Sequence, residues 1–417
     1  FGKSVADYYS IDRLDPAYRV YFGTNDYLDI ASDIDKIKAE FERLEPGAAK
    51  KLDQFMNNAR QNYEIAIHDI VYRPGESIGE LISLKTIKRL PLFFKTISGQ
   101  VRSLFKHPKI IKILEFPVLF LGAKPRNTPA FYNFMNFADF GMGTWFPKNG
   151  MYDIIQGMVN LAETQGVTFK TNAKVSSISV KNNQISGLVV NDTFTPFDLV
   201  VSGADYHHTE QLLENPYRMY SEKYWDKRVL APSCLLFFVG FDKKLDRVEH
   251  HNLFFDTDFE AHATSIYDRP EWPENPLFYA NFTSLTNPST APDGCENGFF
   301  LIPIAPGIED SEDLRKHYFE LIIERFEQLT QQKVREHVLF AESFGIKDFV
   351  SQYHSYKGNA YGLANILTQT AFLRPKLRSK KVKGLFFTGQ LTVPGPGVPP
   401  SLISGKLSAE LVLKSLQ

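Results

Sequence analysis

The C-terminal segment, residues 384–417, constrains the fold of this chain more than any other. It reads GLFFTGQLTVPGPGVPPSLISGKLSAELVLKSLQ, a short apolar run, a loop rich in Gly and Pro, and an amphipathic stretch. The run Leu385–Phe387 is short and is closed by Gly389, which predicts a strand buried on both faces. Pro399 and Pro400 suit the first turn of a helix, where a missing N–H costs no hydrogen bond. The segment therefore predicts a strand, a tight loop and a helix.

The predicted helix has two distinct faces. Its apolar positions recur at helical spacing and mark a buried face: Ile403, Leu407 and Leu411. Its charged positions form an exposed stripe: Lys406, Glu410 and Lys414. Gly405 would let the helix approach another backbone closely, and the free amides of its first turn would form an anion site at the end of the strand. A strand-loop-helix connection without a ligand is the alternative.

This segment resembles the C-terminal flavin motif of the bacterial-type phytoene desaturases, which ends in a strand, a Gly/Pro loop and a helix with a sequence like SGKLAAEL. The matching positions are 388–390, 394–399 and 404–411. In that family the loop contacts FAD and the start of the helix faces the pyrimidine end of the flavin, where a reduced flavin holds negative charge. The resemblance implies cofactor contacts at Gly389, Gln390, Gly397, Val398, Pro399 and Ser401.

Two further segments are similar to motifs of the same family. Residues 139–151 match its tryptophan, aromatic, proline, basic, glycine signature, with Asn149 where Gly is common. Residues 198–205 match its DxVVSNAD element, with Gly in place of the usual Asn. Between them, residues 167–190 predict a meander of short strands separated by turn residues. The resemblance implies cofactor contacts at Trp145, Val175, Gly203 and Asp205.

The family begins with a strand, a GxGxxG turn and a helix that hold the FAD pyrophosphate. This sequence opens at Phe1 without such a unit, and residues 395–400 only start like the fingerprint before ending in Pro. We therefore expect the chain to be a fragment. The fold class implied is α/β, with an incomplete glutathione-reductase-like, Rossmann-type FAD domain, a mixed-sheet substrate domain and a helical membrane-facing subdomain.

A chain of 417 residues exceeds the size at which single hydrophobic cores stop growing, so two or three domains are expected. We expect a remnant of the FAD domain with a substrate-domain hairpin, a helical substrate and membrane region, an FAD segment, a substrate-binding domain and a C-terminal FAD segment, in the order 1–45, 46–145, 146–205, 206–365 and 366–417. Local patterns predict a hairpin over 18–30, a helix capped by Ser32 and a helix over 151–163.

Charge and cysteine content exclude several functions. Lys plus Arg number 47 and Asp plus Glu 48, so no overall field would attract nucleic acid. Cys234 and Cys295 lie far apart without CxxC spacing, which argues against a disulfide scaffold or a zinc site. The histidine pairs 207–208 and 250–251 lack the i, i+4 spacing of two metal ligands on one helix face, so they are interpreted as structural. Because we find neither a signal peptide nor a membrane-spanning run, we expect a cytoplasmic protein attached peripherally to the cytoplasmic membrane face.

Residues 85–116 differ from the rest in charge. They interleave cations with Phe, Leu and Ile, contain no acid between Lys85 and Lys112, and are divided by Pro91, Gly99 and Pro108. Short helices with basic and apolar faces are typical of segments that lie in an anionic membrane interface. A charged face over an ordinary core is the alternative. A nucleic-acid surface is less favoured, because the Phe residues sit with Leu and Ile. A second basic cluster, residues 374–383, is expected to form an exposed turn.

Dehydrogenating an unactivated CH–CH pair needs a hydride acceptor, and no amino-acid side chain can serve as one, so a cofactor such as FAD is required. A carboxylate beside it would accept the proton or stabilise positive charge. Asp139, just before the tryptophan motif, is the candidate; a helix cap or a surface acid is its alternative role. The chain is also rich in Phe (35) and Tyr (19), which suits either a core or a tunnel for a polyene.

The sequence thus predicts an FAD-dependent carotenoid desaturase that introduces double bonds into phytoene or diapophytoene, a C40 or C30 polyene, at the membrane surface. A carotenoid isomerase or a retinol-saturase-like flavoenzyme is one alternative. A lipid-binding protein without catalysis is another.

Overall fold

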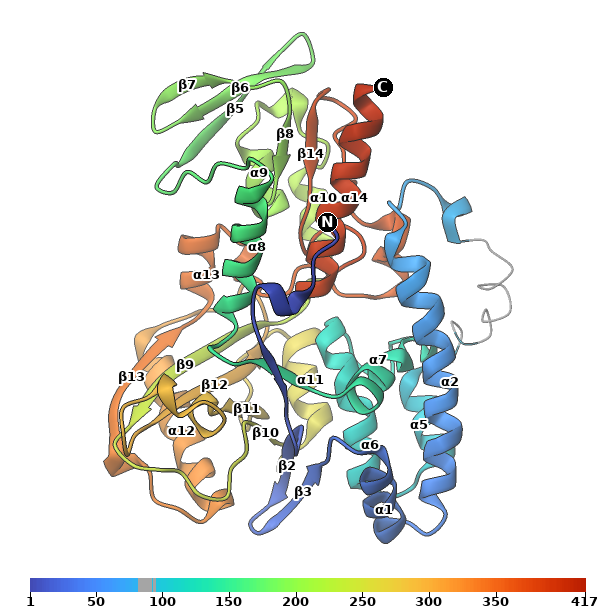
Figure 1. Cartoon of the computed structure of the whole chain (residues 1–417), viewed down its shortest axis with the longest axis vertical. Helices are drawn as coiled ribbons and strands as arrows, with labels where there is room; N and C mark the ends of the chain where they lie inside the picture. The colour runs from blue at the N-terminus through green and yellow to red at the C-terminus, as the bar shows by residue number, and fades with distance from the viewer. Residues whose placement is uncertain (82–91, 93–94) are drawn as a thin grey trace. The chain divides into compact units, whose positions relative to one another are not determined.

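The computed structural model describes residues 1–81, 92 and 95–417 (Figure 1). The chain folds into two compact units, each assembled from three separate stretches. Unit 1 comprises Phe1–Ala49, Ala138–Lys170 and Cys234–Gly345, and unit 2 comprises Lys50–Phe137, Thr171–Ser233 and Ile346–Gln417.

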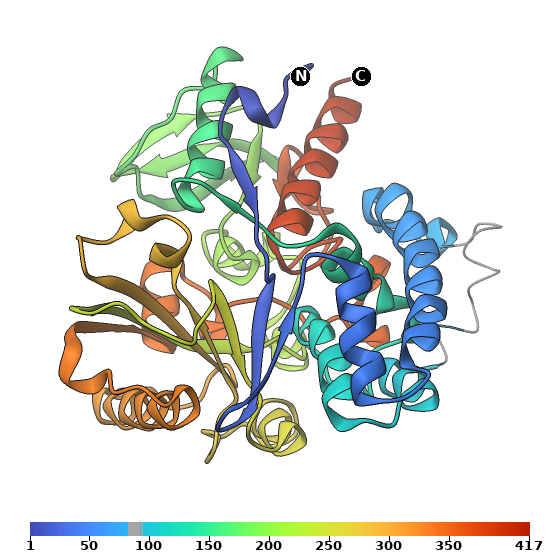
Figure 2. The ribbon, with the colours of Figure 1, turned by 60° about the horizontal axis from the view of Figure 1, so that its bottom comes forward.

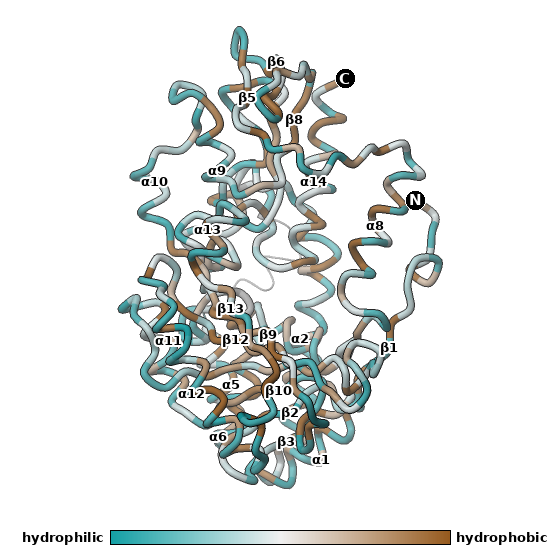
Figure 3. The backbone as a smooth tube through the Cα atoms, turned by 90° about the vertical axis from the view of Figure 1, so that its left-hand side faces the viewer, coloured by the Kyte–Doolittle hydropathy of each residue, from teal (hydrophilic) through white to brown (hydrophobic). Residues whose placement is uncertain are grey.

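A seven-stranded mixed sheet forms the centre of unit 1, in the order β13-β9-β12-β11-β10-β2-β3. Its strands are β2 (Tyr18–Gly23), β3 (Asp26–Ile30), β9 (Ser233–Phe241), β10 (His251–Phe254), β11 (Phe278–Asn281), β12 (Glu296–Ile304) and β13 (Val338–Phe344). The hairpin predicted over 18–30 is confirmed as β2 and β3, whereas β10 runs parallel to β2. Apolar residues dominate strand β9, as its colouring indicates (Figure 3).

The two faces of this sheet differ in whether helices pack on them. Helices α11 (Phe259–Tyr267) and α12 (Glu312–Thr330) lie along one side (Figure 2). On that side the ring of Phe254 is buried and stacks on Phe278 at 4.2 Å between centroids. Side chains alternate along a strand, so neighbouring residues point to the opposite face. There Phe238 and Phe340 are 43% and 54% exposed.

The remaining elements of unit 1 flank this sheet in sequence. Strand β1 (Ile11–Arg13) pairs with β4 (Trp145–Pro147), and the helices are α1 (Ile34–Leu44) and α8 (Tyr152–Thr164). The helix predicted over 151–163 is confirmed as α8. The cap of α1 was predicted one residue too early: the carboxylate of Asp33 accepts the N–H of Asp35, and Ser32 N–H donates to Asp15 instead.

Unit 2 combines helices with two small sheets. Its helices are α2 (Ala48–His68), α5 (Ile97–Leu104), α6 (Pro108–Glu115), α7 (Phe134–Asn136), α9 (Tyr206–Gln211), α10 (Glu222–Asp226), α13 (Ile346–Tyr353) and α14 (Val398–Leu416). Strands β5 (Val175–Lys181), β6 (Gln184–Val190) and β7 (Thr193–Pro196) form the predicted meander. Strands β8 (Val200–Ser202) and β14 (Leu385–Phe387) form a parallel pair, with α14 beside β14 (Figure 1).

The C-terminal prediction is confirmed in its elements and corrected in one detail. All three residues of β14 are buried, and α14 begins where the prolines indicated. The buried face of α14 contains Leu407 and Leu411, and also Ser404 and Ser408. Gly405, however, is not needed for a close approach, because an added Cβ would lie 3.8 Å from Thr388 Oγ1, an ordinary contact.

The described part of the basic stretch 85–116 packs into unit 2; residues 85–91, 93 and 94 lie outside the described residues. Its apolar side chains are core residues: Ile97, Val101, Phe105, Ile110, Ile113, Leu114 and Phe116. Lys95 and Lys106 remain exposed, and Arg102 pairs with the buried Glu115 at 2.8 Å. In this part the alternative of a charged face over an ordinary core therefore fits. None of the helices in the described ranges is long and apolar enough to cross a bilayer.

The second basic cluster was predicted to be an exposed turn, and for one residue this is wrong. Arg378, Lys380, Lys381 and Lys383 are exposed. Arg374 is only 2% exposed, because carbonyl and amide oxygens of unit 2 surround its guanidinium group. Charge spacing alone does not distinguish a solvated cation from a buried one.

Candidate functional site

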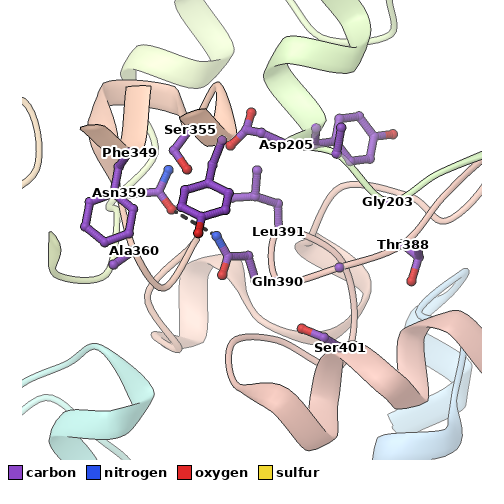
Figure 4. Close-up of a pocket in the computed structure, with 14 residues that line it drawn as sticks. Gly203, Asp205, Phe349, Ser355, Asn359, Ala360, Thr388, Gln390, Leu391 and Ser401 are labelled. Carbon is purple, nitrogen blue, oxygen red and sulfur yellow. Dashed lines mark hydrogen bonds between the residues drawn. The ribbon is translucent and has the colours of Figure 1, made fainter. Parts of the chain in front are cut away.

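A cavity of about 410 Å³ opens in unit 2 beyond the carboxyl ends of the parallel strands β8 and β14 (Figure 4). Its walls come from residues 203–206 after β8, residues 388–391 after β14, Ser401 of α14, and residues 349–360 in and after α13. In open α/β sheets, ligands bind in the crevice outside the carboxyl ends of the strands. The cavity occupies that position.

The helix α14 (Val398–Leu416) begins beside this cavity, and its first three positions carry one backbone N–H, that of Val398. Its N-cap is Gly397 at φ +108°, and no side chain in the described ranges bonds the first amides. Pro399 and Pro400 carry no N–H, and Ser401 N donates to the Gly397 carbonyl at 3.0 Å. Such a helix start favours negative charge in front of it.

Ser404 fixes α14 against the end of β14. Its hydroxyl accepts the N–H of Gly389 at 2.8 Å and donates to the carbonyl of Ser401 at 2.6 Å, while Thr388 Oγ1 lies 2.6 Å away. Gly389 has φ +101°, a conformation that L side chains rarely adopt. The loop geometry thus depends on a glycine and a buried serine, and the role of Ser404 was missed by the sequence reasoning.

The carboxylate of Asp205 joins two walls of the cavity. Oδ1 accepts the N–H of His208 and caps α9, and Oδ2 accepts the N–H of Tyr356, both at 3.1 Å. Desolvation raises the pKa of Asp205, and the two backbone hydrogen bonds act in the opposite direction. Asp205 therefore positions the wall around residues 355–359.

Gln390 forms the wall opposite, and three residues that were not predicted to belong to the site support it: Asn359, Arg374 and Gly362. Its side-chain amide points to Asn359 Oδ1 at 3.5 Å (Figure 4). Its carbonyl accepts Nη1 of Arg374 at 3.4 Å. A Cβ added to Gly362, at φ +93°, would lie 2.8 Å from that carbonyl. These residues come from other segments of the chain, so no local pattern reports them.

The predicted cofactor residues divide between the two units. Five line the cavity in unit 2: Gly203, Asp205, Gly389, Gln390 and Ser401. Gly397, Val398 and Pro399 form the start of α14, and Val175 begins β5; these four are not among the lining residues. Trp145 lies in unit 1, where it is 49% exposed and Nε1 donates to the carbonyl of Met142 at 3.0 Å.

Asp139 also lies in unit 1, inside a single π-helical turn, Phe137–Gly141. Its Oδ2 accepts the hydroxyl of Tyr18 at 2.7 Å. Desolvation raises the pKa of Asp139 to about 7, although the Tyr18 hydrogen bond acts in the opposite direction. A π-turn often marks a functional position. Asp139 is therefore a partly buried acid with a tyrosine partner, and not the helix cap or surface acid of the alternative interpretation.

The side chains that line the cavity suit the ring system of a flavin. Phe349 and Tyr353 provide aromatic surface, and Gln390 and Ser401 provide polar groups at the edge. The uncapped start of α14 suits the part of a flavin that becomes negative on reduction. In the described part of the chain, no group of three or more His, Cys, Asp or Glu residues is arranged to hold a metal ion.

The fold is shared with an oxidoreductase and an oxidase of known structure. An oxidoreductase from Methanosarcina mazei superposes with a TM-score of 0.60 at 15% identity, covering 97% of this chain and 82% of that one. A putrescine oxidase variant gives a TM-score of 0.57 at 10% identity, covering 97% and 83%. The sequence matches the model of the family described as flavin containing amine oxidoreductase over residues 19–413.

Three curated relatives show to which group within this family the chain is similar. A carotenoid 3,4-desaturase of Haloarcula japonica is 38% identical over 420 residues, covering 100% of this chain and 85% of that protein. A 4,4'-diapophytoene desaturase of Staphylococcus haemolyticus is 28% identical, covering 100% and 86%. A zeta-carotene-forming phytoene desaturase of Myxococcus xanthus is 27% identical, covering 99% and 80%. The chain therefore belongs to the flavin-containing amine oxidoreductases and, within them, to the carotenoid desaturase group, and FAD is its cofactor.

Proposed function

We propose that this protein dehydrogenates a long polyene hydrocarbon of the phytoene or diapophytoene kind and that the cavity of unit 2 holds the flavin ring. The observation that carries the proposal is the cavity at the carboxyl ends of β8 and β14, in front of the uncapped start of α14. Bound FAD supplies the hydride acceptor that no side chain provides.

The residues of unit 2 bind and orient the ring. The backbone of Gly389 allows close approach at the end of β14, and the amide of Gln390 offers a hydrogen bond at the ring edge. The rings of Phe349 and Tyr353 exclude water from one side of the cavity. The amide dipoles of α14 stabilise negative charge in front of the helix.

The polyene offers no hydrogen-bonding group, so apolar contact and exclusion of water must position it. We assign it to the face of the seven-stranded sheet opposite α11 and α12, where Phe238 and Phe340 are exposed. There Phe238 lies 5.4 Å from Phe299 between ring centroids, and Phe299 lies 6.3 Å from Tyr279. Phe340 of β13 lies over Gly240 of β9, so that a Cβ added to Gly240 would meet its ring. These four aromatic residues lie on the adjacent strands β13, β9, β12 and β11.

We assign Asp139 as the base that accepts the proton from the substrate. As hydride leaves one carbon of the CH–CH pair, the neighbouring carbon releases a proton to a carboxylate oxygen of Asp139, and the electron pair of that C–H bond forms the new C=C bond. Desolvation brings the pKa of Asp139 to about 7, which suits a base at physiological pH. Tyr18 orients the carboxylate through its 2.7 Å hydrogen bond.

A polyene of this length dissolves in the bilayer, so we propose peripheral attachment to the cytoplasmic membrane face. Within the described residues the support is the exposed basic side chains of the 95–112 region, among them Lys95 and Lys106, because the apolar residues there are buried. Cations near an anionic membrane surface contribute about 1 kcal/mol each. The attachment proposed is therefore electrostatic.

The assay that tests the function uses the flavin-loaded protein and phytoene or diapophytoene in liposomes, with products followed by absorbance. We expect a red shift from added conjugation, and none from liposomes with FAD alone. A product with unchanged conjugation but altered cis/trans geometry would indicate an isomerase. Loss of conjugation would indicate a saturase, and a protein that extracts the polyene without binding flavin would be a lipid-binding protein.

A further inference from the structure

Arg374 is a buried cation without a buried counter-ion. The residue is 2% exposed, and across the part of the chain that the structure describes it forms no ion pair with Asp or Glu. The ionisable side chains that act on its charge are the phenols of Tyr132 and Tyr224. Burial lowers the pKa of Arg374 to about 10, so the group stays charged at neutral pH.

Its guanidinium group is held by oxygen atoms alone. Nη2 donates to the carbonyl of Leu363 at 2.9 Å and to Oδ1 of Asn365 at 2.5 Å, and Nη1 donates to the carbonyl of Gln390 at 3.4 Å. Nε is buried without a hydrogen-bond partner among the described residues. Neutral dipoles therefore solvate the charge only in part, and its positive field is not cancelled by a neighbouring carboxylate.

The position of this charge links it to the cavity. Gln390 is both a wall residue of the cavity and an acceptor for Arg374. Gly395, in the loop that leads to α14, has φ +140°, and a Cβ there would lie 3.2 Å from Nη2 of Arg374. The guanidinium group therefore lies directly behind the loop that joins β14 to α14. In a protein interior a charge at this range acts with little screening.

We propose that Arg374 is a positioning residue with an electrostatic role: it fixes the Gln390–Gly395 loop and its uncompensated charge favours the anionic, reduced form of the bound flavin. The inference rests on the proposed flavin site. A clamp alone would not need a charge, since neutral donors also form hydrogen bonds with carbonyl groups. The charge of Arg374 lies without a counter-ion beside the proposed flavin site. The flavin becomes negative there when the substrate is oxidised.

The experiment compares the two-electron reduction potential of the flavin in the wild-type holoenzyme with that in Arg374→Gln and Arg374→Lys, by reductive titration against a reference dye. Both variants lose the fork geometry of the guanidinium group, but only the first loses the charge. We expect Arg374→Gln to lower the relative affinity for reduced over oxidised FAD at least tenfold, a shift of about 30 mV for two electrons. We expect Arg374→Lys to keep the wild-type potential.

Equal potentials in wild type and Arg374→Gln would overturn the electrostatic role, even if FAD binds more weakly. If Arg374→Gln fails to fold, the pH dependence of the wild-type potential decides. A slope of about 30 mV per pH unit means that the reduced flavin takes up one proton and is anionic, and about 59 mV means that it is neutral, which overturns the inference. Wild-type protein that holds no flavin, or holds it without converting the polyene, would overturn the proposed function instead.

Discussion

The hydroxyl of Tyr18 donates a hydrogen bond of 2.7 Å to Oδ2 of Asp139, across 121 positions of sequence. It connects the first strand of the hairpin with the π-turn that precedes the tryptophan motif. Desolvation raises the pKa of Asp139 to about 7, and burial, together with the charge of that carboxylate, raises the pKa of Tyr18 well above its ordinary value. The pair therefore holds one proton on the phenol and leaves the carboxyl group able to titrate near neutrality.

Asp139→Asn is expected to lower the rate of polyene dehydrogenation by a factor of roughly 10²–10⁴, the usual contribution of a positioned base. Flavin content should stay at the wild-type level, because Asp139 lies in unit 1. Asp293→Asn, at an exposed turn of the same unit, is the matched control and should leave the rate unchanged. The rate of absorbance increase in the liposome assay measures both. A fully active Asp139→Asn variant would mean that Asp139 is not the base.

The pH dependence tests the Tyr18 contact. With carboxylate as the base, the wild-type rate should rise with pH through about 7. Because the hydrogen bond from Tyr18 favours the charged form, Tyr18→Phe should move the midpoint to higher pH. A profile that is identical in both proteins would contradict this assignment.

The raised pKa of Asp139 also makes the stability of the fold depend on pH. The pKa of Asp139 is higher in the folded chain than in the unfolded one, so the folded state binds more protons between about pH 4 and 7. Stability from this group therefore falls as pH rises through that window. In Asp139→Asn this part of the fall should be missing, and thermal unfolding of the two proteins at pH 4.5 and 7.5 would show it. The melting temperature at pH 4.5 minus that at pH 7.5 should be larger in wild type than in Asp139→Asn.

Gly362→Ala tests the wall of the cavity. A Cβ at this position would lie 2.8 Å from the carbonyl of Gln390, so Gln390 must move, and we expect FAD affinity to fall at least tenfold, or about 1.4 kcal/mol. Gly294→Ala is the control, since Gly294 has φ +79° but nothing within 4 Å. It should bear a similar backbone cost, about 1 to 2 kcal/mol of stability, with unchanged FAD affinity. Titration with FAD, followed by fluorescence quenching, distinguishes the two variants.

Two Phe→Ala changes on one sheet separate stability from substrate binding. Phe254 is buried between Tyr21 and Phe278, so Phe254→Ala should lower the free energy of unfolding by about 3 to 5 kcal/mol. Phe340 is 54% exposed on the opposite face, and Phe340→Ala should cost under about 1 kcal/mol while raising the KM for the polyene. Urea unfolding and steady-state kinetics measure the two effects. An unchanged KM in Phe340→Ala would remove this face from the polyene site.

Membrane attachment is tested through charge. Replacing Lys95 and Lys106 by Gln should weaken binding to anionic vesicles by about 2 kcal/mol, near thirtyfold, because each cation contributes about 1 kcal/mol. Lys223→Gln with Lys227→Gln, at exposed positions in and after α10, is the matched control. Co-sedimentation with vesicles at low and high salt gives the comparison. Binding that resists salt and the double change would contradict an electrostatic attachment by this region.

Local sequence patterns were sufficient for most of the helices and strands near the site. The hairpin, α8, β14 and α14 follow from alternation, helical spacing and the positions of Gly and Pro, which act through neighbours in the chain. The same kind of evidence failed where burial decides. Arg374 shares its spacing with the exposed cations that follow it, and the apolar residues of 97–116 have the same periodicity whether they face a membrane or a core.

The sequence by itself determined the strand, loop and helix at the C-terminus, the glycines that the loop needs, and the resemblance that brings FAD with it. Only the tertiary structure decided which distant segments meet. It brought residues 349–360 against Gln390, placed the Arg374 charge behind the cavity loop and gave Asp139 its tyrosine partner. The physical reason is that desolvation and hydrogen bonding across hundreds of positions depend on the packed chain, whereas turns and amphipathic faces are fixed by residues within a few positions of one another.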